Sequence, residues 1–104
     1  MVKKNASVFI SGEGSNLRSL IKNSRDYTFP VKIKLIVTDN KNAKGIKYAK
    51  KYSIPYLIFK DSLISEKMIL NEHFKRNISI ICLAGFMKIL SRNFIANFKK
   101  KIVN

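Results

Sequence analysis

Short apolar runs alternate with stretches of helical periodicity along the chain. Five runs have the composition of β-strands, since they are apolar, often β-branched and bounded by polar residues, proline or glycine. These predicted strands are residues 7–10, 31–37, 56–59, 78–84 and 101–104. Between them, apolar residues recur three and four positions apart, which is typical of amphipathic helices. The predicted helices are residues 16–23, 43–52, 65–75 and 91–98, with Ser65 and Ser91 as the N-caps of the last two.

The regular alternation of strand and helix predicts an α/β fold. We expect a Rossmann-like parallel sheet of about five strands, with right-handed crossovers and helices on both faces. No repeat or linker divides residues 1–104, so we expect a single domain. Ligands of such sheets bind at the carboxyl ends of the strands, where the strand order reverses. For the order 3-2-1-4-5, loops 11–16 and 85–90 should face each other across one crevice.

The first of these loops favours an anion. Gly12 and Gly14 predict a tight turn, and Ser15 and Asn16 stand where the helix begins. Such a turn gathers backbone N–H groups at the positive end of the helix dipole, which suits a phosphate. The third glycine of the dinucleotide fingerprint is replaced by Leu17, so a single phosphate fits better than a pyrophosphate. Loop 85–90 is apolar and suits either a flat ring or a core-packing turn under the last helix.

Two residues with reactive side chains have structural interpretations. The apolar positions of helix 65–75 are predicted to be Met68, Ile69 and either His73 or Phe74. His73, the only histidine, is most simply a half-exposed helix residue far from both loops, and a poor candidate for a catalytic base. Run 78–84 is almost continuously apolar and predicts a strand buried on both faces, with the lone Cys82 buried and inert within it. We find no spacing of histidine, cysteine and carboxylates typical of a metal site.

Charge is the unusual feature of the composition. The 104 residues include 21 lysines and arginines against 6 acidic residues, giving a net charge of +15. Because the basic residues are spread along the chain, a solvated surface is the first interpretation and attraction to an anionic metabolite the second. Nucleic acid is an unlikely partner, since no recognition motif is present. No apolar run approaches the ~20 residues of a membrane helix, and no signal peptide is evident, so we expect a cytoplasmic protein.

Two stretches carry a resemblance to a known family. Residues 11–17 (Ser-Gly-Glu-Gly-Ser-Asn-Leu) and 83–91 (Leu-Ala-Gly-Phe-Met-Lys-Ile-Leu-Ser) resemble the signature stretches of phosphoribosylglycinamide formyltransferases. The similarity runs colinearly over the whole chain. It implies transfer of a formyl group from 10-formyltetrahydrofolate, as co-substrate, to the amine of glycinamide ribonucleotide in purine synthesis, without a metal.

The resemblance also assigns roles to individual residues. The implied substrate-phosphate ligands are Gly14, Ser15 and Asn16, the implied substrate contact is Gly85, and the implied folate contacts are Met87, Lys88, Ile89, Leu90 and Asn104. Asn104 is in addition the implied catalytic residue, because its side-chain N–H could stabilise the oxyanion of a tetrahedral intermediate.

The chain departs from the family pattern at its end. In the family the catalytic asparagine is followed at once by a motif with a catalytic histidine, and later by an aspartate; neither follows Asn104. We therefore expect a chain truncated before that motif, similar to the N-terminal half of the enzyme, with little formyl transfer of its own. The alternatives are a catalytically incomplete phosphate- or nucleotide-binding module and a basic nucleic-acid-binding protein. The sequence leaves the oligomeric state open.

Overall fold

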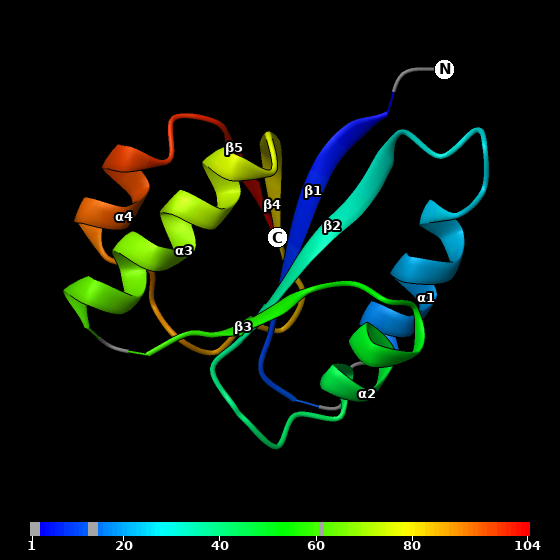
Figure 1. The fold of residues 1–104 in the computed structure, drawn as a ribbon, viewed down its shortest axis with the longest axis horizontal. Coiled ribbons are helices and arrows are strands. Elements are labelled where there is room, and N and C mark those ends of the chain that lie inside the picture. The colour runs from blue at the N-terminus through cyan, green and yellow to red at the C-terminus, as the bar shows by residue number, and fades with distance from the viewer. Residues whose placement is uncertain (1–2, 13–14, 61) are drawn as a thin grey trace.

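The computed structural model describes residues 3–12, 15–60 and 62–104, and it contains strands and helices in strict alternation (Figure 1). The strands are β1 (Lys4–Ile10), β2 (Val31–Thr38), β3 (Tyr56–Ile58), β4 (Ile78–Leu83) and β5 (Lys101–Val103). The helices are α1 (Ser15–Ser24), α2 (Gly45–Lys51), α3 (Leu63–Lys75) and α4 (Arg92–Asn97). The predicted elements are thus all present, with ends shifted by a few residues.

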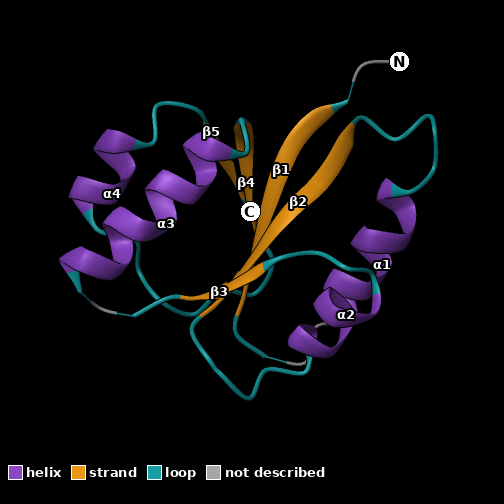
Figure 2. Cartoon of the chain, in the orientation of Figure 1, coloured by secondary structure: helices purple, strands orange, loops and turns teal. Residues whose placement is uncertain are grey.

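The five strands form one parallel sheet in the order β3-β2-β1-β4-β5. Helices α1 and α2 cover one face and α3 and α4 cover the other (Figure 2). The predicted α/β Rossmann-like sheet, including its strand order, is confirmed. Since β1 and β4 are neighbours whose crossovers lead to opposite faces, the loops that follow them flank the switch point.

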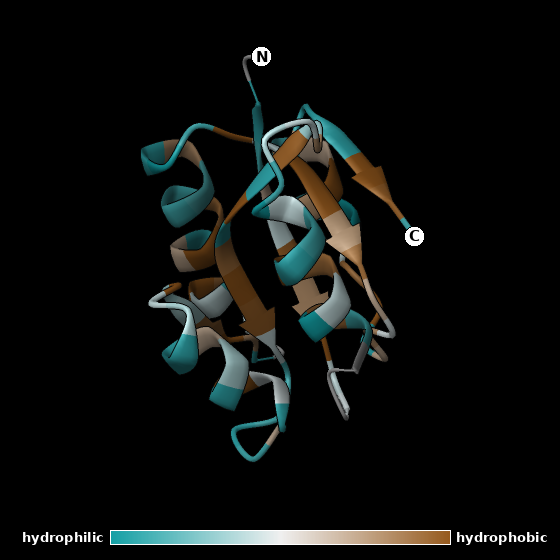
Figure 3. Ribbon diagram, turned by 90° about the vertical axis from the view of Figure 1, so that its right-hand side faces the viewer, coloured by the Kyte–Doolittle hydropathy of each residue, from teal (hydrophilic) through white to brown (hydrophobic). Residues whose placement is uncertain are grey.

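Two apolar layers hold the helices on the sheet. Along β1, Phe9 faces the layer under α3 and α4, whereas Val8 and Ile10 face the layer under α1 and α2. This alternation is the period-two geometry of a strand with both faces covered. Figure 3 shows the result, with hydrophobic strands at the centre and mostly hydrophilic helix surfaces outside.

The predicted boundary and buried face of α3 were partly wrong. The N-cap is Ser62, whose Oγ accepts a hydrogen bond from the backbone N–H of Ser65 at 3.1 Å. The helix therefore begins earlier than predicted, and Ser65 Oγ instead accepts from the backbone N–H of Lys60. Its buried residues are Glu66, Ile69, Leu70 and His73, while Met68 and Phe74 are exposed. Apolar residues of this helix occur on several of its sides, so periodicity alone did not identify the side that faces the sheet.

Strand β4 is less covered than predicted. Only Ile78 and Ile81 are fully buried, and Cys82 is partly exposed rather than buried. The physical reason is that the outer neighbour of β4 is β5, a short edge strand. Partial burial still raises the pKa of the Cys82 thiol, so the thiol stays protonated at neutral pH.

His73 is fully buried, which corrects its interpretation as a half-exposed residue. Its Nδ1 lies 2.7 Å from the Ile69 carbonyl oxygen, which can only accept, so Nδ1 carries the proton. Nε2 then accepts a hydrogen bond from Ser7 Oγ at 2.7 Å, in the middle of β1. Phe9 and Phe98 pack against the ring, with ring centroids 5.7 and 5.5 Å away. The imidazole is a buried polar link between α3 and β1.

The burial of His73 makes stability depend on pH. Burial lowers the pKa of His73 below its ordinary value of 6.5, so the unfolded chain binds more protons as the pH falls. We expect the contribution of His73 to the free energy of unfolding to be fully present above pH 6.5. It should decrease as the pH falls below 6.5, until the lower pKa of the folded state is reached. Urea denaturation across this range measures the slope, and His73→Leu should flatten it.

The same pair offers an internal control. His73→Leu leaves the Ser7 hydroxyl buried without its partner, which should cost roughly 1–3 kcal/mol. The double variant Ser7→Ala/His73→Leu removes both polar groups and should recover part of that loss. A slope that persists in both variants would show that another group titrates.

Candidate active site at the carboxyl edge of the sheet

The loops after β1 and β4 meet at the carboxyl edge of the sheet. Within the sheet Phe9 pairs with Leu83, and just beyond it the Ala84 N–H donates to the Phe9 carbonyl at 2.9 Å. One step further, the Met87 backbone N–H donates to Ser11 Oγ at 2.8 Å. This hydrogen bond joins the two loops, as expected from the strand order. Sequence reasoning gave Ser11 no role, although a hydroxyl directly after a central strand is well placed for one.

Loop 11–16 leads into α1. Gly14 lies outside the described residues, Ser15 is the first residue of α1, and Asn16 is exposed in its first turn. Leu17 is fully buried against β1 and α2, so the position of the dinucleotide motif's third glycine is used for core packing. The first turn contains no acidic residue to oppose an anion at the helix N-terminus.

Loop 85–90 is anchored at two points. Phe86 packs edge-on against Phe9 and Phe59, with ring centroids 5.3 and 5.4 Å apart. At the other end Leu90 is only 9% exposed and belongs to the core beneath α4. The core-packing interpretation therefore holds for the two ends of this loop, while its middle faces solvent.

The middle of the loop presents apolar side chains outward. Met87 is 79% exposed and Ile89 is 91% exposed, and Lys88 between them is also exposed. The predicted folate contacts within this loop thus divide into three exposed residues and the buried Leu90. Gly85, at the start of the loop, has φ of +76°, a left-handed conformation that favours glycine.

The remaining predicted residue lies at the same edge. Asn104 follows β5 and is exposed, and its neighbour Val103 pairs with Cys82 of β4. After β2, Asp39 adds a carboxylate whose buried Oδ1 has no hydrogen-bond partner among the described residues. His73 does not join this group, because its two ring nitrogens are bonded to Ser7 and Ile69.

The arrangement can bind and orient two ligands side by side. The start of α1 can hold an anion, and the outer surface of loop 85–90 can hold an apolar ring. Within residues 3–12, 15–60 and 62–104, no cluster of three histidine, cysteine or acidic side chains could hold a metal ion. No helix in the same ranges is long and apolar enough to cross a membrane.

Comparison with known proteins places the chain in a family. The family described as formyl transferase matches residues 4–104. The chain belongs to the formyl transferase family. The resemblance carried by the two loop sequences is thereby confirmed.

The relatives are enzymes of purine synthesis by name. The chain is 31% identical to the phosphoribosylglycinamide formyltransferase of Haemophilus influenzae, over 97% of its own length and 50% of that protein. It is also 31% identical to the human trifunctional purine biosynthetic protein adenosine-3, over 98% of its length and 11% of that protein.

Solved structures give the same picture. The phosphoribosylglycinamide formyltransferase of Brucella melitensis matches with a TM-score of 0.86 and 34% identity, over 97% of this chain and 55% of that one. The chain spans about half the length of the separate formyltransferases it matches.

Gly12 and Gly85 together provide a test of the backbone conformation at the start of loop 85–90. An added Cβ meets nothing within 4 Å at either Gly12 or Gly85, but only Gly85 has a positive φ. Gly85→Ala should therefore destabilise the fold by about 1–2 kcal/mol through backbone strain alone. Gly12→Ala is the matched control and should change the free energy of unfolding by less than about 0.5 kcal/mol. Equal losses in urea denaturation would contradict the left-handed conformation at Gly85.

Proposed function

We propose that this chain forms the ligand-binding part of a phosphoribosylglycinamide formyltransferase. In this reaction the amine of glycinamide ribonucleotide attacks the formyl carbon of 10-formyltetrahydrofolate. The observation that carries the proposal is the Ser11–Met87 hydrogen bond, because it joins a phosphate-type loop to an exposed apolar loop. Membership of the formyl transferase family supports the same reaction.

The substrate phosphate would bind at the start of α1. Ser15 and Asn16, together with Gly14 outside the described residues, would supply backbone N–H groups to it, and the helix dipole adds partial positive charge there. No acidic side chain in the first turn opposes the phosphate. Glycinamide ribonucleotide would then extend from α1 toward Gly85, where a residue without a side chain leaves space for the reacting amine.

The folate ring would lie on the outer surface of loop 85–90. Met87 and Ile89 offer apolar side chains that a flat ring can cover, and such burial contributes about 25 cal/mol per Å² of apolar surface. Lys88 lies between them on the same loop. Leu90 would act indirectly, by anchoring the loop in the core beneath α4.

Asn104 would assist the chemical step. When the amine nitrogen forms a bond to the formyl carbon, the carbonyl oxygen gains negative charge, and the asparagine side-chain N–H can donate to it. Collapse of this intermediate breaks the bond between the formyl carbon and the folate nitrogen, and a proton passes from the attacking amine to that leaving nitrogen. We propose that a residue beyond these 104 moves that proton, because His73 is committed to Ser7 and Ile69.

We propose that the protein acts in the cytoplasm. A reducing compartment suits Cys82, a lone and partly exposed thiol.

Phosphate binding can be tested by calorimetric titration with glycinamide ribonucleotide. Asn16→Asp places a negative charge in the first turn of α1 and should weaken binding about tenfold or more by repelling the phosphate. Asn23→Asp makes the same change at the opposite end of the same helix and should leave the affinity nearly unaltered. Equal affinities for both variants, or no heat with the unaltered chain, would contradict the phosphate site.

Formyl transfer can be tested by complementation. The purified chain is mixed with a polypeptide that covers the unmatched half of the Haemophilus influenzae relative, and formylated product is measured. We expect transfer in the mixture and little from the chain alone, since general acid–base catalysis contributes about 10²–10⁴-fold. Asn104→Ala should lower the rate in the mixture by roughly 10²-fold or more through loss of an oxyanion donor. Asn97→Ala is the control on the exposed surface of α4.

The outcomes separate the two candidate functions. Binding of glycinamide ribonucleotide without transfer in the mixture would favour a phosphate-binding module without turnover. A rate that Asn104→Ala leaves unchanged would remove Asn104 from the catalytic machinery while leaving the binding proposal intact.

A further inference from the structure

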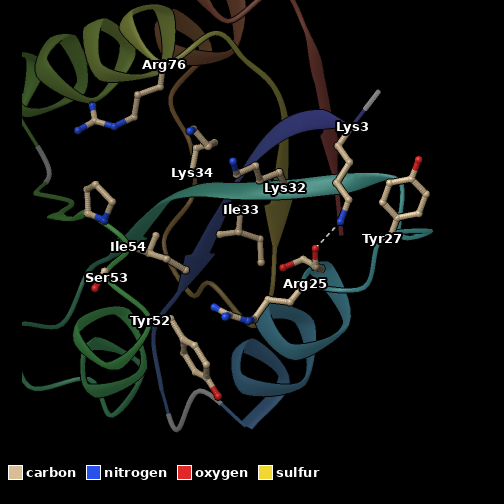
Figure 4. A pocket seen from close by; sticks show the side chains of 12 residues that line it. Lys3, Arg25, Tyr27, Lys32, Ile33, Lys34, Tyr52, Ser53, Ile54 and Arg76 are labelled. Carbon is tan, nitrogen blue, oxygen red and sulfur yellow. Dashed lines mark hydrogen bonds between the residues drawn. The ribbon is translucent and has the colours of Figure 1, made fainter. Parts of the chain in front are cut away.

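A hollow lies at the amino-terminal edge of the sheet, opposite the candidate active site. It has a volume of about 720 Å³ and opens beside the first half of β2 (Figure 4). Lys3 precedes β1, Arg76 follows α3, and segment 53–55 leads from α2 into β3, so chain ends from several elements surround it. The parallel strands place this hollow away from the carboxyl edge that carries the candidate active site.

The hollow exists because β3 is short. It pairs with β2 only from Ile36 to Thr38, so the outer edge of β2 at residues 32–34 has no strand beside it. Ser53, with φ of +56°, turns the chain out of α2. The Ile54 N–H then donates back to the Ala49 carbonyl, and the Pro55 carbonyl accepts from the Ile36 N–H. These bonds fix segment 53–55 as the wall facing the open edge of β2.

Five cationic side chains line the hollow. They come from four segments, with two on β2, and are Lys3, Arg25, Lys32, Lys34 and Arg76. No carboxylate is part of its lining, and only Arg76 forms an ion pair with a described residue, Glu72. Among the described residues, Lys3, Arg25, Lys32 and Lys34 therefore have no carboxylate within ion-pair distance.

Some of these cations are held in place. Lys3 Nζ donates to the carbonyls of Ser24 and Asp26 at 2.6 and 2.5 Å, which fixes it beside the end of α1. The Arg25 guanidinium lies over the Tyr52 ring, 5.5 Å from its centroid. A cationic wall that is partly fixed before binding loses less side-chain entropy when an anion arrives.

Both sides of β2 contribute to the hollow, and Arg25 shares one side with the apolar side chains. In Figure 4, Lys32, Lys34 and Arg76 lie on one side of β2, while Ile33 and Tyr52 lie on the other. Lysines on an open strand edge can serve simply to prevent pairing with other chains. That role explains Lys32 and Lys34, but it does not explain why cations from other segments and an apolar wall converge on the same cavity.

We propose that this hollow binds a nucleoside polyphosphate. The phosphates would lie by Lys32, Lys34 and Arg76. The base would lie beside Arg25, against the partly buried side chains of Ile54 and Tyr52. The volume is within the range of about 300–1,000 Å³ typical of small-molecule sites. A single-stranded nucleic acid is the less favoured ligand, because it needs a groove that tracks the backbone over several nucleotides.

The test is a calorimetric titration of the chain with ATP in magnesium-free buffer. We expect one ATP bound per chain, with an affinity that falls as salt is added because the cations are partly exposed. Adenosine carries only the base and sugar, and tripolyphosphate carries only the phosphates. Each should therefore bind at least tenfold more weakly than ATP.

Charge-matched variants locate the binding site. Lys32→Gln/Lys34→Gln should weaken ATP binding about tenfold through loss of two phosphate contacts. Lys67→Gln/Lys99→Gln removes the same charge from exposed positions on α3 and after α4, and should change the affinity less than twofold. Thermal unfolding followed by circular dichroism confirms that both double variants fold.

Five results would overturn the inference. Equal losses in the two double variants would mean general attraction by a basic surface. Tripolyphosphate bound as tightly as ATP would remove the base from recognition. A short oligouridylate that binds more tightly than ATP and is weakened by Lys32→Gln/Lys34→Gln would make this a nucleic-acid surface. Loss of ATP binding in Asn16→Asp would place the nucleotide at α1. If the chain bound glycinamide ribonucleotide normally but did not bind ATP, the nucleotide site would be refuted and the proposed function would stand.

Discussion

Strand β1 has no solvent-facing side from Ala6 to Ile10, and the rest of the structure is arranged around that burial. Its apolar side chains form the centre of both core layers. A polar residue in such a strand must find a partner, and Ser7 finds it in His73 of α3. This burial ends with the strand. The next residue, Ser11, lies at the sheet edge, and its Oγ accepts a hydrogen bond from the backbone N–H of Met87.

The Ser11–Met87 bond explains how an apolar loop can remain exposed. Loops with outward apolar side chains usually collapse onto the core unless their backbone is fixed. Here Phe86 and Leu90 pack inward on either side, and the Met87 N–H is held by Ser11, so the Met87 and Ile89 side chains project into solvent. A surface prepared in this way loses little entropy when a flat ligand covers it.

The sequence was sufficient for the fold and for the neighbourhood of the site. Alternating periods of strand and helix determine a parallel sheet, and the order of its strands decides which loops meet. It was not sufficient for His73 or Leu90. Both lie in segments with apolar residues on several sides, and the side that turns inward depends on contacts with elements distant in the chain. The sequence also could not predict that Asp39 Oδ1 has no hydrogen-bond partner among the described residues, because burial of one oxygen depends on the packing of the loop after β2.

The basic hollow could not be predicted for a related reason, and it changes how the net charge of +15 should be understood. Lys3, Arg25 and Arg76 belong to segments that meet only after the sheet has formed. At the carboxyl edge, an anion would be held chiefly by the backbone of a helix N-terminus, which needs no lysine. At the amino edge it would be held by side-chain cations, whose effect is local because salt screens exposed charges beyond about 8–10 Å. The two proposed anion sites therefore differ in chemistry, since only the one at the amino edge would depend on lysine and arginine side chains.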